Sequence, residues 1–352
     1  MSMGLIRESV ERMTGYVPGE QPKGGDIIKL NTNENPYPPS PKVAEALRRI
    51  DVDSLRKYPD PVSASLRERV AQMHGCGVDN VFVGNGSDEI LALCTRAFVE
   101  NDGSVGYFDP SYSLYPVLSD IRDVCKCAVP LDSDFGWQRP ADDLCSLFFL
   151  TNPNAPTSML FAKSDVESFC AGFKGVVLID EAYVDFSSEN CMDLALKYEN
   201  VLVMRTLSKS YSLASLRVGY IVGHPKPVEA LIKIKDSYNL DGVAQVLALA
   251  ALNDVDYMRA NAERIIATRE SLAAELRDAG FAVCPSESNF LWVRPPQKIS
   301  AEDLFEKLKD KGILIRYFSD SVINQYVRIT VGTDAEVSAL MQAVRLIIES
   351  GK

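Results

Sequence analysis

This 352-residue chain has very little histidine, no long apolar run and no excess of basic charge. The two histidines, His74 and His224, are too few for a histidine-rich metal site, so we expect no metal. With 37 basic and 48 acidic residues, the net charge of −11 argues against binding to nucleic acid or to an anionic membrane. No apolar run approaches the roughly 20 residues that span a bilayer, and the N-terminus lacks the apolar core of a signal peptide.

Two further signatures are absent. The eight cysteines form no Cys-x-x-Cys pair, which is typical of buried reduced thiols in a cytoplasmic protein. No Gly-x-Ser-x-Gly elbow is evident, which argues against a hydrolase. What is present is the composition of a soluble globular protein, 46% apolar and 24% charged, with a length that favours two domains.

A lysine follows the short apolar run Val201–Met204, which is typical of a buried strand. Ligands of an open α/β sheet bind at the carboxyl ends of its strands, so Lys209 is placed to attack a carbonyl and form a Schiff base. Thr206, Ser208 and Arg217 could bind a phosphate nearby. The alternative interpretation is a solvated loop lysine.

An acid follows a second apolar run, Val176–Ile179. Asp180 is either a helix cap or the partner of a buried cation. Pyridoxal phosphate (PLP) needs an acid that keeps its ring nitrogen protonated, and it also needs a Schiff-base lysine. A tyrosine or asparagine must also bind its phenolic oxygen. Asp180, Lys209 and Tyr183 fit these three roles, so we expect PLP as the cofactor.

The motifs Asp180–Tyr183 and Arg205–Gly219 resemble those of the fold-type I aminotransferases, and specifically of the histidinol-phosphate aminotransferase family. The resemblance extends from Tyr16 to Thr333. It implies an α/β fold with a mostly parallel sheet in a large, aspartate-aminotransferase-like PLP-binding domain. A smaller α+β domain would be formed by the C-terminus and the N-terminal segment, and the protein would be a homodimer.

Other cofactor contacts are expected around a glycine turn, Gly84–Glu89, that precedes a helix to about residue 98. Ser87 can cap this helix, and in the resembling family the turn holds the cofactor phosphate, which implies roles for Ser87 and Asp88. The resemblance also places Tyr58 against the cofactor phosphate of the neighbouring subunit. Tyr112, expected early in the next helix, could lie against the pyridine ring or simply pack in the core.

One motif departs from the family pattern. The family has asparagine directly before Pro-Thr-Gly, whereas this chain has Ala155 before Pro156 and Ser158 in place of the glycine. The hydrogen bond to the cofactor oxygen is therefore expected from Asn154 or Asn152, and Asn154 is preferred.

Substrate contacts are expected from two arginines and from the N-terminal loop. Arg328 lies in an apolar strand, so an anion must meet its charge: a fixed carboxylate in the structural interpretation, a substrate anion in the functional one. The resembling family uses the matching arginine for substrate, and Arg316 resembles a second one. The loop Leu30–Pro39, dense in asparagine and proline, carries a family pattern that favours binding, and the resemblance implies Asn33 and Tyr16 as contacts.

The expected organisation has an N-terminal segment, a large domain and a small domain, with boundaries at 1–40, 41–254 and 255–352. Periodicity predicts three successive helices of which the last bridges the domains. These cover about 225–236, 242–253 and 255–278, and a short helix is expected over 2–13.

The resemblance implies a transaminase that converts histidinol phosphate and 2-oxoglutarate to imidazole acetol phosphate and glutamate, in histidine biosynthesis. Its partners would be these small molecules and a second copy of the chain. An aromatic amino-acid aminotransferase and a PLP-dependent threonine-phosphate decarboxylase need the same cofactor site and stay open. A non-catalytic ligand-binding protein on the same fold is the alternative from another class.

Overall fold

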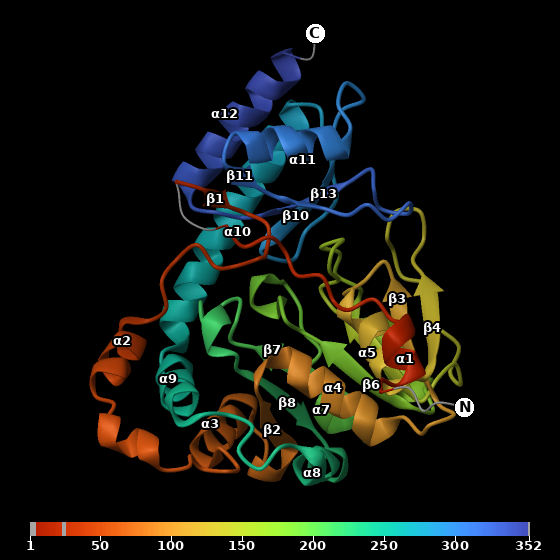
Figure 1. The fold of residues 1–352 in the computed structure, drawn as a ribbon, viewed down its shortest axis with the longest axis vertical. Coiled ribbons are helices and arrows are strands. Elements are labelled where there is room, and N and C mark those ends of the chain that lie inside the picture. Colours follow the sequence, from red (N-terminus) through yellow and green to blue (C-terminus); the bar gives the residue numbers. More distant parts are fainter. Residues whose placement is uncertain (1–4, 23–25, 351–352) are drawn as a thin grey trace.

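A seven-stranded sheet lies at the centre of the larger part of the molecule (Figure 1), in a computed structural model that describes residues 5–22 and 26–350. The strand order is β2-β8-β7-β6-β5-β3-β4. All neighbours from β7 to β4 pair in parallel, and β8 runs antiparallel to both β2 and β7. This confirms the mostly parallel α/β fold. The strands are β2 (Val81–Gly84), β3 (Ser104–Asp109), β4 (Cys125–Pro130), β5 (Leu147–Thr151), β6 (Val176–Asp180), β7 (Val201–Thr206) and β8 (Gly219–Gly223).

Both faces of this sheet are covered by helices, which explains why its central strands are continuously apolar. Alternate residues of β6 enter different cores: Val177 and Ile179 pack on one face and Leu178 on the other. The helices are α2 (Pro41–Arg48), α3 (Ala64–His74), α4 (Gly86–Phe98), α5 (Leu114–Arg122), α6 (Lys163–Gly172), α7 (Leu194–Lys197), α8 (Pro225–Ile234) and α9 (Gly242–Leu252). Helices α3, α6 and α9 cover the first face, and α4, α5 and α8 cover the second.

The smaller part contains a four-stranded antiparallel sheet in the order β12-β13-β10-β9. A separate parallel pair, β1 with β11, attaches the N-terminal segment to it, and Leu30 enters the same core. Its elements are β1 (Ile28–Lys29), β9 (Ala282–Val283), β10 (Phe290–Arg294), α11 (Ala301–Asp310), β11 (Ile313–Leu314), β12 (Arg316–Tyr317), β13 (Val327–Thr330) and α12 (Asp334–Ser350).

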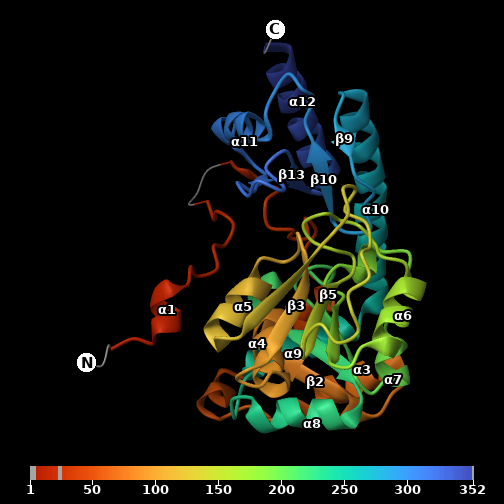
Figure 2. The ribbon, with the colours of Figure 1, turned by 90° about the vertical axis from the view of Figure 1, so that its right-hand side faces the viewer.

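Helix α10 (Val255–Asp278) has the predicted bounds and runs through both parts (Figures 1 and 2). Its N-terminal half gives Met258 and Ile265 to the core of the larger part, and its C-terminal half gives Leu272 and Leu276 to the core of the smaller part. The bridging helix is therefore confirmed. The domain boundaries at residues 40 and 254 stay predictions.

Three local predictions need correction. Helix α1 covers only Glu8–Arg12 of the expected 2–13, residues 1–4 lie outside the described part, and Figure 2 shows the helix beside α5. Ser87 is not a cap, because α4 already begins at Gly86 with Asn85 in the cap position. Tyr112 precedes α5, which begins at Leu114.

Within the described ranges, no helix is long and apolar enough to cross a membrane. The same residues include no group of three or more His, Cys, Asp or Glu side chains arranged to hold a metal ion.

Candidate active site

One pocket lies where the carboxyl ends of β5, β6 and β7 face the smaller part of the molecule. Every site residue predicted from the sequence lines it, except Tyr58 and the two alternative asparagines, Asn152 and Asn154. The grouping follows from topology, because the carboxyl ends of neighbouring parallel strands meet at one edge of the sheet.

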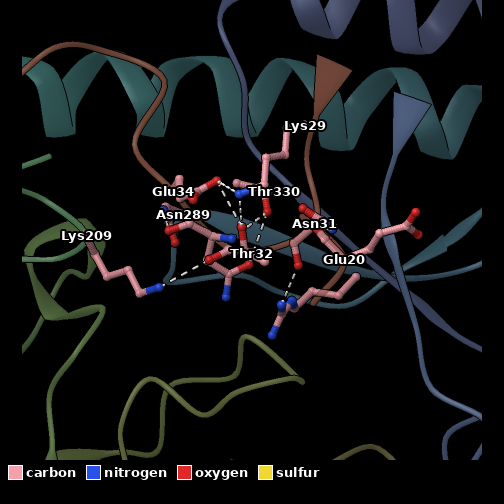
Figure 3. Close-up of polar contacts among 10 residues, drawn as sticks. Glu20, Lys29, Asn31, Thr32, Glu34, Lys209, Asn289 and Thr330 are labelled. Carbon is pink, nitrogen blue, oxygen red and sulfur yellow. Dashed lines mark hydrogen bonds and ion pairs between the residues drawn. The ribbon is translucent and has the colours of Figure 1, made fainter. Parts of the chain in front are cut away.

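Lys209 lies three residues beyond the end of β7 and points into this pocket. Its Nζ donates a hydrogen bond of 3.3 Å to the carbonyl oxygen of Thr32 (Figure 3). Burial, followed by the nearby charge of Arg328, lowers the pKa of Lys209 from 10.5 to about 8. An amine with such a pKa is partly neutral near physiological pH, as a nucleophile must be.

Asp180 is the last residue of β6 and is only 4% exposed. Its carboxylate accepts a hydrogen bond of 3.0 Å from the Tyr115 hydroxyl and one of 3.1 Å from the backbone N–H of Ala182. Burial raises the pKa of Asp180 to about 6, although these two hydrogen bonds lower it. A cation beside this buried carboxylate would stabilise its charged form, which suits a protonated ring nitrogen.

The start of α4 and the loop after β7 form an anion-binding corner. Ser87 and Asp88 lie in the first turn of α4, where backbone N–H groups are unpaired. Gly86 has φ +78°, a conformation that favours glycine, and a Cβ there would lie 2.6 Å from Nη2 of Arg217, so the guanidinium would have to move. Arg217 donates to Ser208 Oγ at 3.4 Å and to Asp88 Oδ2 at 3.3 Å. Thr206 lies behind them and accepts the Ser208 N–H at 3.2 Å.

This set of donors fits PLP. An anion-binding corner for a phosphate, a buried acid for the ring nitrogen and a lysine of lowered pKa line one pocket. The tyrosine expected at the phenolic oxygen, Tyr183, lines it too, and Lys209 Nζ lies 5.7 Å from the centroid of its ring.

Neither Asn154 nor Asn152 lines this pocket, and a contact of either side chain with the cofactor stays a prediction. Asn154 is fully buried below the pocket, where its Nδ2 donates to Pro110 O at 3.0 Å and its Oδ1 accepts from Ser111 at 2.9 Å. The Asn152 side chain donates to the carbonyl oxygen of Phe161 and accepts the backbone N–H of the same residue. Both side chains hold the loop together, and Ala155 is the residue of this motif that lines the pocket.

Tyr58 also lies away from this pocket. It is 80% exposed and stacks on Tyr238 with ring centroids 4.4 Å apart. A role in a neighbouring subunit stays a prediction, because no partner chain is present.

The arginines occupy the side of the pocket formed by the smaller part. Arg328 donates to Asn31 O at 2.9 Å and lies 5.3 Å from the ring centroid of Phe290 and 5.7 Å from that of Phe318. Its Nε has no partner, and none of the ion pairs in the described residues includes it. The fixed carboxylate of the structural interpretation is therefore missing from the described part of the chain, and the charge is available to a ligand.

Arg316 and two tyrosines complete that side. Arg316 donates to Val17 O at 3.4 Å and lies 5.2 Å from the ring centroid of Phe318. Tyr16 meets the edge of Tyr112 at 6.0 Å between centroids. The predicted substrate residues thus surround one opening.

Sequence reasoning missed several groups of this site. Tyr115 binds Asp180, and the only signal for it was that a buried acid needs a donor. Phe318 lies beside both arginines. The Thr32 carbonyl that holds Lys209 is a backbone group, so no residue type could have indicated it.

Comparisons with known proteins agree with this geometry. Residues 25–344 match the family model for aminotransferase class I and II. The histidinol-phosphate aminotransferase of Rippkaea orientalis is 44% identical over 97% of this chain and 98% of that protein, and the one from Gluconacetobacter diazotrophicus is 44% identical over 96% of each. A crystal structure of histidinol-phosphate aminotransferase from Sinorhizobium meliloti in complex with pyridoxal-5'-phosphate has a TM-score of 0.85, 26% identity and 92% coverage of both chains. The chain belongs to the aminotransferase class I and II family, among the histidinol-phosphate aminotransferases.

Proposed function

We propose that this chain is a PLP-dependent transaminase that converts histidinol phosphate and 2-oxoglutarate to imidazole acetol phosphate and glutamate. One observation carries the proposal: the pocket joins Lys209 and the buried Asp180 to Arg328, whose charge lacks a carboxylate partner among the described residues. The names of the relatives and the cofactor of the Sinorhizobium meliloti structure support it.

Each side chain has a task that follows from its position. PLP, when bound, supplies the electron sink that makes the proton on the substrate carbon removable. Lys209 holds the cofactor and moves that proton, Asp180 keeps the ring nitrogen charged, and Tyr183 donates to the phenolic oxygen. Ser87, Ser208 and Arg217 hold the cofactor phosphate, together with the N–H groups of α4.

The two substrates differ in shape but share an anionic group. Histidinol phosphate presents a phosphate, and 2-oxoglutarate presents a second carboxylate. A guanidinium donates two parallel hydrogen bonds to either group, so Arg328 and Arg316 serve both halves of the reaction. The aromatic ring of Phe318 lies beside both arginines.

The first prediction is that the purified protein with PLP uses histidinol phosphate in preference to phenylalanine and to threonine phosphate. We expect kcat/KM to fall by about tenfold or more for phenylalanine, because its single carboxylate offers the two arginines fewer charged oxygens than a phosphate does. Parallel assays with 2-oxoglutarate as acceptor measure this ratio. Release of carbon dioxide from threonine phosphate would favour the decarboxylase instead, and no turnover of any amine would favour a ligand-binding protein.

Reduction with borohydride gives an independent check of the same proposal. The reduced protein should carry the pyridoxyl label on Lys209, which peptide mapping identifies. A label on another lysine would remove Lys209 from this role.

We also propose a homodimer in which Tyr58 completes the partner's phosphate site. The exposed apolar side chains that precede it closely in the sequence, Val52 and Leu55 at 75% and 59%, support a surface that is covered by another chain. Tyr58→Phe should then weaken cofactor binding about tenfold, because one hydrogen bond to a charged phosphate is lost.

Equilibrium titration with PLP and sedimentation of the wild-type protein measure these two properties. Tyr238→Phe is the matched control, since it keeps the ring stack and removes a neighbouring hydroxyl. A monomer with full activity at assay concentration would contradict the proposal.

The eight free cysteines support the cytoplasm as the location of the protein, which cell fractionation would test.

A further inference from the structure

Asn33 is held in the loop between β1 and α2 by contacts with the smaller part of the molecule. Its backbone has φ +56°, a left-handed conformation that asparagine tolerates better than most residues. Its carbonyl oxygen accepts a hydrogen bond of 3.0 Å from Asn289 Nδ2, and the residue is 1% exposed. Figure 3 shows Asn289 and Thr330 gathered beside this loop. The backbone of Asn33 is therefore fixed.

The orientation of the Asn33 amide follows from its contact with Thr330. The Thr330 hydroxyl accepts the backbone N–H of Asn33 at 3.0 Å, and it donates its own proton to Asn33 Oδ1 at 3.2 Å. A donor facing Oδ1 fixes which end of the amide is oxygen. Nδ2 must then point the other way, and it donates to the Tyr183 hydroxyl oxygen at 3.0 Å.

This contact decides where the Tyr183 proton points. A tyrosine hydroxyl has one proton to donate, and its oxygen here already accepts from Asn33. No acceptor for that proton is found among residues 5–22 and 26–350, whereas the pocket lined by Tyr183 is directly beside it. The hydroxyl is left to donate into the pocket.

We propose that Asn33 is a positioning residue that aims the Tyr183 proton at the phenolic oxygen of the bound cofactor, rather than a substrate contact. The inference rests on the proposed function only in naming that acceptor. Asn33 acts in two ways: its N–H occupies one lone pair of the Tyr183 oxygen and so orients the hydroxyl, and the same bond makes the phenol a stronger donor.

The consequence is measurable on the bound cofactor. The proton shared between the cofactor's linkage to Lys209 and its phenolic oxygen leaves a negative oxygen behind when it dissociates. A donor at that oxygen stabilises the deprotonated form and lowers the pKa of the linkage. Neither Asn152 nor Asn154 lines the pocket, so they do not replace this donor when it is lost.

The experiment is a pH titration of the visible absorption of the PLP-loaded protein. Asn33→Gly removes the amide without straining the left-handed backbone. It should raise the pKa of the linkage by about half to one pH unit, as expected for a weakened hydrogen bond. Asn33→Asp supplies a carboxylate that accepts the hydrogen bond of the Tyr183 hydroxyl, which then no longer donates into the pocket. The pKa of the linkage in this variant should therefore rise as far as it does in Tyr183→Phe.

The double variant Asn33→Gly/Tyr183→Phe separates positioning from other effects. If Asn33 acts through Tyr183, the double variant should titrate like Tyr183→Phe alone, because coupled residues are not additive. Thr330→Val removes the hydroxyl that donates to Asn33 Oδ1, so the Asn33 amide is no longer held at that end. This variant should give an intermediate shift in the pKa of the linkage. It keeps the proposal testable if the loop variants fold poorly.

Asn31→Ala is the matched control, since the Asn31 amide belongs to the same loop but donates to Glu20 O at 2.9 Å. Its absorption should titrate as in the wild type. Wild-type titration in the Asn33 variants, or a further shift in the double variant, would overturn the positioning role. A raised KM with an unchanged spectrum would show the substrate contact predicted from the sequence instead. A wild-type protein that gains no visible absorption with PLP would contradict the proposed function itself.

Discussion

Asp180→Asn should lower kcat roughly a hundredfold to several thousandfold while the protein still folds. The amide keeps the shape of the side chain but cannot hold a proton on the cofactor's ring nitrogen. Removing one partner of a buried ion pair costs about 3–5 kcal/mol, and each 1.36 kcal/mol in the barrier is tenfold in rate. Single-turnover rates with histidinol phosphate, and the absorption spectrum of the bound cofactor, measure the loss.

Glu181→Gln is the matched control for this change. Glu181 is the next residue along the chain and is also buried, but it pairs with Arg205 at 2.7 Å and does not line the pocket. Its substitution should lower the stability and leave the cofactor spectrum unchanged. If Asp180→Asn kept wild-type turnover and spectrum, another acid would have to serve the ring nitrogen.

In the cofactor-free protein at neutral pH, Asp180→Asn should raise the stability of the fold, although the same change lowers kcat of the PLP-loaded protein. Burial raises the pKa of Asp180 from 3.8 to about 6, so the fold favours the protonated carboxyl. That contribution is fully present below about pH 3.8 and is lost as the pH rises through 6, by about 3 kcal/mol for a shift of this size. Without PLP at pH 7 the variant should therefore be more stable than the wild type, and this advantage should shrink when PLP is added. Thermal unfolding with and without PLP at pH 4 and pH 7 would show this reversal.

The main elements of the fold could be predicted because a buried face requires apolar residues at a regular local spacing. Strands β5, β6 and β7 are covered on both faces, so they are continuous apolar runs, and α10 shows helical periodicity over its whole length. Strand β8 was not predicted as an antiparallel member, because direction depends on which strands it pairs with rather than on its own residues. The two-residue strands β1 and β11 are too short to show any period.

The site was predictable where the chemistry demands a particular residue type. A lysine and an acid at strand ends are recognisable, and the structure brings Lys209 and Asp180 into one pocket. The sequence could not distinguish the structural asparagines from those that reach the pocket, because their hydrogen-bond partners lie far away in the sequence. The Asn154 amide donates to the Pro110 carbonyl, and the Asn33 amide oxygen accepts from the Thr330 hydroxyl. Only the folded chain therefore shows which amide closes a loop and which reaches the pocket.

Arg328→Ala should impair both halves of the reaction, by about 2–5 kcal/mol each if the charge pair with substrate is desolvated. The guanidinium lies 5.3 Å and 5.7 Å from the ring centroids of Phe290 and Phe318, and its Nε is unpaired, so part of its hydrogen-bonding capacity is available to a ligand. Arg328→Lys should restore only part of the activity, because a point charge cannot make two parallel hydrogen bonds. Single-turnover rates with histidinol phosphate and with glutamate measure the two halves separately.

The pattern of losses decides how the substrates are bound. Arg316→Ala is the comparison, since this arginine also lies beside Phe318 and lines the pocket. Arg328 also helps to lower the pKa of Lys209, so Arg328→Ala should raise that pKa and slow both halves further near neutral pH. If only the glutamate half suffers, Arg316 binds the phosphate. If neither half suffers, the unpaired guanidinium is structural, and the assignment to histidinol phosphate loses its best physical support.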